Sequence, residues 1–457
     1  MNNKNCGDYI DSPKSDALFA ALYGDDGVAA ARLRYRRLIG EFPAACADSS
    51  SGAACGELRA FSVPGRTELG GNHTDHNGGK VLAAAVQLDA AAVATPRADR
   101  RVFFRSSGHR DIDVDISSLA KREEESGDTE ALVRGIAAEF AAQGTPVGGF
   151  TANTDNAVLT GSGLSSSAAV EVLLAKIFDS LYCGGRRSAL ELAKIAQKAE
   201  NLYFGKPCGL MDQIACASGG VVAIDFGNCE PGDTQDPHIK SVAFDPAAAG
   251  FTLCVVATGG SHSSLTDEYA AIPAEMKAAA AFFGKATLGE LDERELAPRI
   301  AELRRAVGDR TVLRALHFFS ENRRVDTMLA ALQRAADSAS ADATTAAMER
   351  FFSLVRESGD SSYKLLQNIY PPENPAGQGL SLALALTENF LYGGGTTSGA
   401  RNGACRVHGG GFAGTIQTYL PREKLEEYRR LIEGVFGKGA LTVLRIRQQG
   451  AGELAGG

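Results

Sequence analysis

Residues 159–171 read LTGSGLSSSAAVE and join a glycine-rich loop to the start of a predicted helix. Gly161 and Gly163 permit tight turns and let backbone N–H groups come close to a ligand. Three serines follow where the helix is predicted to begin, and a helix N-terminus presents unpaired N–H donors with partial positive charge. The lysine of a Walker loop is absent. The stretch therefore predicts a phosphate-binding loop of another type, although an ordinary serine N-cap uses the same residues.

The chain has 457 residues, which favours two or three domains. It is 44% hydrophobic and 22% charged, as in globular proteins. No stretch approaches the roughly 18 apolar residues of a membrane span, and residues 1–14 lack the apolar segment of a secretory signal. The nine cysteines include no Cys-x-x-Cys pair, which favours reduced thiols. These features predict a cytoplasmic protein with no membrane partner.

The net charge of −8 argues against nucleic acid as the main ligand, because nucleic-acid binding usually comes with a basic face. Apolar periodicity predicts both strands and helices, and residues 267–356 are predicted to be almost entirely helical. The pattern indicates an α+β protein with a boundary between residues 229 and 249. The strands are expected at 58–63, 101–106, 112–116, 220–225, 252–257 and 413–420, and the helices at 29–42, 130–143, 166–181 and 188–204. Residues 81–95 form a long run rich in Ala and Val.

Residues 64–79, PGRTELGGNHTDHNGG, crowd hydrogen-bonding side chains among glycines. Such a loop suits a polyhydroxylated ligand, because each hydroxyl needs both a donor and an acceptor. His73 and His76 also raise the possibility of a transition-metal site. The glycines argue against a helix that presents both rings, so the metal interpretation is disfavoured.

Asp212 stands in an apolar setting within PCGLMDQ, residues 207–213. A carboxylate in such surroundings needs a partner, since burial penalises its charged form. An aspartate in the first turn of a helix is the simpler alternative. The sequence around it leaves both interpretations open.

These motifs, in this order, resemble those of galactokinases in the GHMP small-molecule kinase family. GSGLSSSAA resembles the nucleotide loop, residues 64–79 the signature Gly-Arg-x-x-x-x-Gly-Glu-His-Thr-Asp-Tyr-Asn-Gly-Gly, and PCGLMDQ the stretch with the catalytic aspartate. VHGGGFAGTIQTY, residues 407–419, resembles a third, glycine-rich motif. The resemblance covers residues 61 to about 420.

The resemblance implies a two-domain α+β fold with the active site in the cleft between the domains. The N-terminal domain would be ribosomal S5 domain 2-like and the C-terminal domain ferredoxin-like. The expected division is an N-terminal extension at 1–57, an ATP- and sugar-binding domain at 58–240, a C-terminal GHMP domain at 241–440, and a terminal strand and tail at 441–457.

The resemblance also assigns roles to individual residues. The expected catalytic residues are Asp212 and Arg66. The expected sugar-binding residues are Asn72, His73, Asp75, Gly209 and Tyr269. The expected ATP-binding residues are Gly161, Ser162, Gly163, Leu164, Ser165, Ser166 and Ser167. Magnesium carried with ATP is expected at Ser167, with Ser166 as second choice, and Glu200.

The implied reaction is ATP-dependent phosphorylation of the anomeric hydroxyl of galactose, giving galactose 1-phosphate. Two positions depart from the signature: Asn72 replaces its glutamate and His76 its tyrosine. A sugar altered at C6 or C2, such as galacturonate or N-acetylgalactosamine, therefore remains an alternative. A sensor that binds ATP and sugar without catalysis and a kinase of mevalonate-like alcohols are rival hypotheses. A monomer and a homodimer are both compatible with the sequence.

Overall fold

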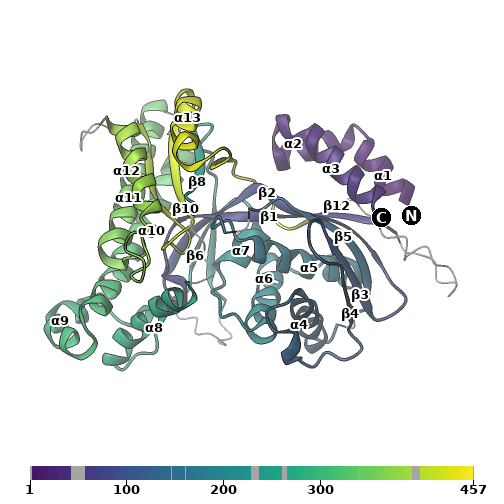
Figure 1. Cartoon of the computed structure of the whole chain (residues 1–457), viewed down its shortest axis with the longest axis horizontal. Helices are drawn as coiled ribbons and strands as arrows, with labels where there is room; N and C mark the ends of the chain where they lie inside the picture. The colour runs from purple at the N-terminus through teal and green to yellow at the C-terminus, as the bar shows by residue number, and fades with distance from the viewer. Residues whose placement is uncertain are drawn as a thin grey trace.

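The computed structural model describes residues 3–42, 57–145, 147–159, 161–227, 236–259, 265–338, 340–393 and 402–455. Within these residues, eight strands form one sheet and four form another, and helices flank both (Figure 1). The predicted α+β class is confirmed. None of the described helices combines the length and apolar character needed to cross a bilayer.

The larger sheet has the order β12-β1-β2-β5-β3-β4, and β6 pairs with both β2 and β7. All pairings are antiparallel except that of β3 with β5. Its strands are β1 (Arg59–Gly70), β2 (Lys80–Pro96), β3 (Arg101–Ser106), β4 (Ile112–Asp115), β5 (Phe150–Asn156), β6 (Val221–Asp225), β7 (His238–Val242) and β12 (Gly452–Ala455).

Helices cover both faces of this sheet, because successive side chains of a strand point to opposite faces. Ala92 of β2 packs in the large core with helix α5, whereas Val93 packs in a separate core with α3. Figure 1 shows the two helical layers on either side of the strands. One layer holds α4 (Thr129–Ala142), α5 (Ser166–Cys183), α6 (Ala189–Lys198) and α7 (Met211–Ser218), and the other α1 (Asn3–Asp11), α2 (Lys14–Tyr23) and α3 (Val28–Gly40).

The smaller sheet has the order β11-β8-β10-β9 and is fully antiparallel. Helices α11 and α12 pack against β9, while the long helix α10 also reaches β1 and β2. Its strands are β8 (Phe251–Ala257), β9 (Ala404–His408), β10 (Thr415–Pro421) and β11 (Leu441–Leu444). The helices around it are α8 (Thr266–Phe282), α9 (Glu293–Val307), α10 (Asp309–Asp337), α11 (Ala341–Ser361), α12 (Gly379–Tyr392) and α13 (Leu425–Phe436).

Most of the predicted elements agree with the observed ones within a few residues, but one strand end was wrong. The strand predicted to stop at Val63 continues through Pro64 to Gly70 as β1. Its register with β2 shifts between Pro64 and Arg66. Such a bulge accommodates a proline, which has no N–H to donate to the ladder. The continuation places Arg66 on a strand, where its backbone is held rigidly.

The predicted terminal strand and tail, 441–457, is described through residue 455, and its two strands join different sheets. β11 adds to the smaller sheet beside β8, and β12 adds to the larger sheet beside β1.

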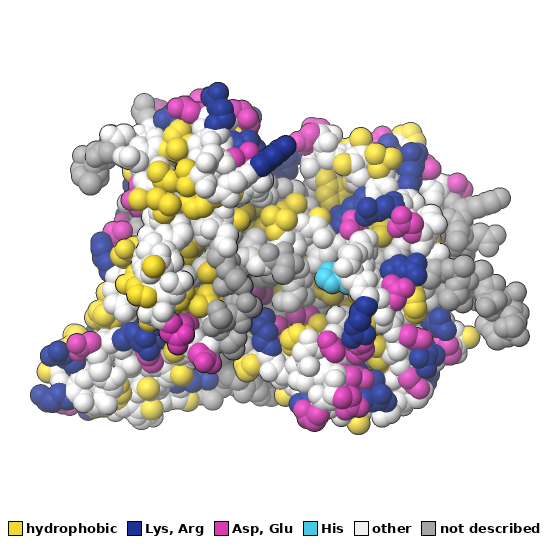
Figure 2. Space-filling view, viewed as in Figure 1, with side chains coloured by type: hydrophobic (Ala, Val, Ile, Leu, Met, Phe, Trp, Pro, Cys, Tyr) yellow, Lys and Arg dark blue, Asp and Glu magenta, His cyan; other side chains and the backbone are white. Residues whose placement is uncertain are grey.

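The surface seen in Figure 2 carries acidic and basic side chains in mixture, with no broad region of one sign on that face.

Candidate active site

Arg66 and Asp212 meet at the centre of the candidate site. Arg66 comes from β1, and Asp212 lies in the first turn of α7. The guanidinium holds both carboxylate oxygens, with Nε 2.7 Å from Oδ1 and Nη2 2.8 Å from Oδ2. This two-point geometry is the strong form of an arginine–carboxylate pair. The structure therefore brings together the two residues that the sequence analysis assigned to catalysis.

The environment keeps Asp212 ionised. Burial alone would raise the pKa of this carboxyl, but the Arg66 guanidinium outweighs it and the Ser165 hydroxyl adds a hydrogen bond. The pKa of Asp212 consequently lies below its ordinary value. Its side chain is still 31% exposed, so an alcohol group can reach the carboxylate.

The serine-rich loop lies directly against this pair. Gly161, Gly163 and Ser165 all have positive φ, and α5 begins at Ser166. The Arg66 backbone N–H donates to the Leu164 carbonyl at 3.0 Å, and its guanidinium also donates to the Gly163 carbonyl. The predicted phosphate loop, residues 161–167, and the Arg66–Asp212 pair are thus one assembly.

The third glycine-rich motif supports this loop through His408. The His408 ring is buried, with Nε2 2.9 Å from Thr67 Oγ1 and Nδ1 3.3 Å from the Ser162 carbonyl oxygen. Thr415 Oγ1 also donates to that carbonyl, at 2.8 Å. Burial lowers the pKa of His408 to about 3, so the ring is neutral. The motif therefore fixes the loop from the side of the smaller sheet.

Asp75 and Gly209 form a second contact between distant segments. A Cβ atom on Gly209 would lie 1.9 Å from Asp75 Oδ2. Only glycine leaves the aspartate in place at this approach. Since Gly209 stands three residues before Asp212, Asp75 is held close to the Arg66–Asp212 pair.

His73 and Tyr269 both contact the glycine loop at residues 409–411. His73 has φ of 59° and places Nε2 2.9 Å from the Gly410 carbonyl oxygen. The hydroxyl of Tyr269, on α8, donates to the Gly411 carbonyl at 2.9 Å. The two rings stack with centroids 6.5 Å apart. The structure thus brings both predicted sugar-binding side chains to one loop.

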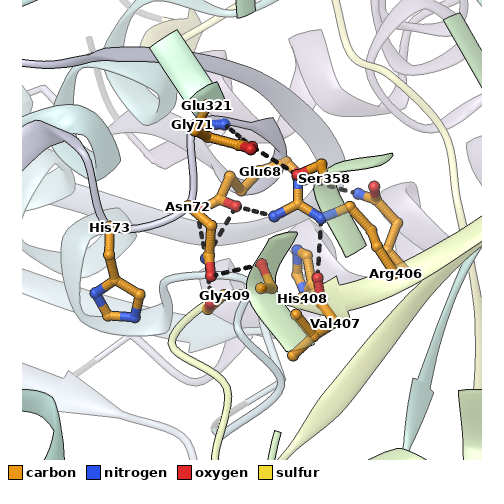
Figure 3. A network of polar contacts seen from close by, with 12 residues as sticks. Glu68, Gly71, Asn72, His73, Glu321, Ser358, Arg406, Val407, His408 and Gly409 are labelled. Atoms are coloured by element: carbon orange, nitrogen blue, oxygen red, sulfur yellow. Dashed lines mark hydrogen bonds and ion pairs between the residues drawn. The ribbon is translucent and has the colours of Figure 1, made fainter. Parts of the chain in front are cut away.

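Asn72 is the most enclosed of the three predicted sugar-binding side chains that contact this glycine loop, because both the nitrogen and the oxygen of its buried amide are bonded by the protein (Figure 3). Nδ2 donates to Glu68 at 3.1 Å and to the Gly409 carbonyl at 2.6 Å. Oδ1 accepts from Asn368 Nδ2 at 2.8 Å and from Ser362 Oγ at 3.4 Å. These four contacts match the hydrogen-bonding capacity of a side-chain amide. A direct contact with a ligand would require one of them to break.

The predicted magnesium ligands come from α5 and from the turn that follows α6. Glu200 sits in a π-helical turn, Ala199–Phe204, and is 3% exposed, with Lys206 Nζ 3.2 Å from its Oε1. Ser167 is exposed in the first turn of α5. Ser166, the second choice, already accepts a hydrogen bond from Asn156 at 2.8 Å. A carboxylate and a hydroxyl are oxygen donors of the kind that Mg²⁺ prefers.

Sequence reasoning missed two residues beside Glu200. Gln213 Nε2 donates to Glu200 Oε2 and to Glu171 Oε2, each at 3.0 Å. Burial raises the pKa of Glu171 well above its ordinary value, and the nearby Glu200 carboxylate adds to the shift. Glu171 lies four residues after Ser167 on α5, so both side chains lie on one face of the helix. That spacing could have identified Glu171 from the sequence.

Comparison with known proteins agrees with this geometry. Two family models match the chain: "GHMP kinases N terminal domain" over residues 131–220 and "Galactokinase galactose-binding signature" over residues 52–96. The galactokinase of Streptomyces coelicolor is 30% identical over 398 residues, which cover 84% of this chain and 90% of that protein. The chain belongs to the galactokinase family.

A second galactokinase, from Actinobacillus pleuropneumoniae, is also 30% identical, over 82% of this chain and 88% of its own length. Among solved structures, Lactococcus lactis galactokinase complexed with galactose superposes with a TM-score of 0.69 at 21% identity, covering 96% of this chain and 99% of its own. A mevalonate kinase gives a TM-score of 0.56 at 13% identity, covering 85% and 98%.

These structural matches establish the GHMP kinase fold, and the sequence relatives confirm the family expected from the motifs. A member of the galactokinase family is an ATP-using phosphotransferase whose acceptor is an alcohol group.

Proposed function

We propose that the chain transfers the γ-phosphoryl group of ATP to the anomeric C1 hydroxyl of galactose, giving ADP and galactose 1-phosphate. The observation that carries this proposal is the two-point pair of Arg66 and Asp212 against the serine-rich loop. Phosphoryl transfer needs mainly positioning and electrostatic stabilisation, and this arrangement supplies both.

In the proposed reaction, the C1 hydroxyl oxygen attacks the γ-phosphorus of ATP. A new P–O bond forms, the bond from that phosphorus to the β–γ bridging oxygen breaks, and ADP leaves. Asp212 either accepts the hydroxyl proton or orients the hydroxyl for attack. Arg66 holds this carboxylate ionised and adds positive charge beside the transferred group.

The loop at residues 161–167 would bind the phosphates through its backbone N–H groups and the N-terminus of α5. Ser167 and Glu200 would hold the magnesium ion, with Lys206 balancing the charge of the carboxylate. When bound, the ion supplies positive charge that neutralises the phosphate oxygens.

The sugar would lie among His73, Asp75, Tyr269 and the backbone of Gly209, which reach the same region as Asp212. Asn72 bears on the choice of sugar. Its two N–H bonds already go to Glu68 and the Gly409 carbonyl, so none remains to donate to a carboxylate at C6. This saturation favours galactose, which is neutral, over galacturonate.

A substrate panel tests the proposal directly. ADP release would be measured with galactose, galacturonate, N-acetylgalactosamine, arabinose and mevalonate, and the product would be assigned by phosphorus NMR. We expect galactose to give the highest kcat/KM and the product to be the 1-phosphate. Binding of ATP and galactose without any turnover would support a sensor instead.

The same proposal includes the cytoplasm as location and a monomer or homodimer as assembly. It also keeps the division at residues 58–240 and 241–440, with the active site between the two domains. The Arg66–Asp212 pair comes from the first of these parts, and His408 and Tyr269 come from the second.

A further inference from the structure

An ion pair lies buried beneath the sugar-binding loop. Glu68 of β1 is 2% exposed and Arg406 of β9 is fully buried, and the Arg406 guanidinium donates to Glu68 Oε1. Figure 3 shows this pair directly beside Asn72. The network contains two carboxylates: Glu321, which accepts from the Gly71 N–H and pairs with Arg324, and Glu68, which accepts from the Asn72 amide. Glu68 stands four residues before the position where the galactokinase signature has its glutamate.

The contacts of Asn72 fix which way its amide points. Nδ2 faces two acceptors, the Glu68 carboxylate and the Gly409 carbonyl, while Oδ1 faces the amide donor of Asn368. Reversing the amide would set its oxygen against a carboxylate and a carbonyl. Glu68 thus orients Asn72, and Asn72 in turn ties the loop at residues 71–73 to the glycine loop at 409–411.

The balance of charge explains why residue 72 is neutral. Of the two guanidiniums that act on Glu68, Arg406 compensates its charge and Arg66 is already paired with Asp212. The Arg324 guanidinium is likewise paired with Glu321. A glutamate at position 72 would place a second buried carboxylate within hydrogen-bonding distance of Glu68. Like charges in a buried setting repel strongly, and one of them must lose its charge or move.

We propose that Glu68 and Asn72 form a coupled pair, in which Glu68 carries the negative charge that contacts residue 72 and requires a neutral amide at that position. Glu68 is then a positioning residue that acts through Asn72 on His73 and on the glycine loop. Either position 68 or position 72 can carry a carboxylate, but not both.

A double-mutant cycle tests the coupling. The variants are N72E, E68Q, E68Q/N72E and, as a control matched in size, N72Q. We expect N72E to lose about 100-fold in kcat/KM for galactose and to melt well below N72Q, because only N72E adds charge. E68Q/N72E should recover to within about fivefold of the original protein, since it again holds one carboxylate beside Arg406.

The kinetic pattern separates positioning from a purely structural role. E68Q should raise KM for the sugar about tenfold and leave KM for ATP unchanged, whereas simple loss of folded protein would lower kcat and leave both KM values alone. Additive losses in E68Q/N72E, or equal behaviour of N72E and N72Q, would overturn the proposal.

If N72E fails to fold, soluble yield and melting temperature of E68Q/N72E against E68Q/N72Q still decide the question. With glutamine at position 68, we expect the glutamate in E68Q/N72E and the glutamine in E68Q/N72Q to give similar yields and melting temperatures. The kcat/KM and KM measurements rest on the proposed function, but the melting temperatures do not. Absence of galactose turnover in the original protein would therefore count against the function alone.

Discussion

Gly209 lies so close to Asp75 that the aspartate carboxylate occupies the space a side chain on the glycine would need. The backbone of Gly209 is not in the left-handed region, so alanine would bring no conformational strain there. The obstacle is the movable end of Asp75. A substitution should therefore displace a proposed sugar ligand rather than unfold the chain.

We expect G209A to raise KM for galactose at least about tenfold and to leave KM for ATP and the melting temperature nearly unchanged, because a displacement of about 1 Å suffices for large losses. Steady-state kinetics with each substrate varied would measure this. G434A is the control, since nothing lies within 4 Å of a Cβ at Gly434. A normal KM in G209A would remove Asp75 from the sugar site.

Asp212 offers the sharpest test of the chemistry. D212N keeps the shape of the side chain but cannot accept a proton, so turnover should fall by about 10³-fold. The rate of ADP release, measured at several enzyme concentrations, would show the loss of turnover. Circular dichroism would check that the variant is folded. Retained turnover with an intact fold would contradict the catalytic role.

The neutral ring of His408 makes stability depend on pH. Its pKa in the folded chain is about 3, below the value near 6.5 of an unfolded histidine. The unfolded chain therefore binds a proton at a higher pH than the folded chain does. The contribution of His408 to the free energy of unfolding is fully present above about pH 6.5 and is lost as the pH falls toward 3.

Between about pH 6 and 4, this one group should contribute a slope of about 1.4 kcal/mol per pH unit. Urea denaturation at several pH values, with H408Q as comparison, isolates the contribution, because other titrating groups are present in both proteins. Identical slopes for the two proteins would show that His408 is not held neutral.

The N-terminal helices are attached through a buried carboxylate. Asp89 of β2 is fully buried and pairs with Arg34 of α3 and with Arg447, whose Nη1 lies 3.4 Å from Oδ2. R34M leaves Arg447 as the partner but removes the stronger contact. We expect a loss of about 2–4 kcal/mol in the free energy of unfolding.

R36M, on the same helix, is the matched control, because Arg36 and its partner Asp11 are both exposed. Exposed pairs contribute less than about 1 kcal/mol. Chemical denaturation of the two variants gives the comparison. A loss no larger in R34M than in R36M would mean that the buried pair does not hold the helices.

The parts of the site that the sequence predicted are those with a local chemical pattern. The loop at residues 161–167 combines glycines and serines at a helix start, and Asp212 stands in an apolar segment that demands a partner. Their convergence required the family resemblance, because Arg66 and Asp212 are 146 positions apart.

The rest depended on tertiary contacts that no local pattern reveals. The amide of Asn72 is bonded by Glu68 of β1, by Gly409 just after β9, and by Ser362 and Asn368 in the segment after α11. The sequence of the loop alone could not show that all its hydrogen bonds are taken. Strand β1 passes Pro64 because a bulge with β2 absorbs the missing donor. Helix α1 was not predicted, since only Cys6 and Ile10 among its described side chains are buried.

Strand β12 borders β1 in the larger sheet, although nearly the whole chain separates them. During synthesis on a ribosome, this edge of β1 stays uncovered until β12 has emerged. Asp89 likewise lacks its second arginine partner until Arg447 has been synthesised. Assembly of the larger sheet therefore depends on synthesis of β12, and a chain that lacks β12 would carry an open strand edge prone to self-association.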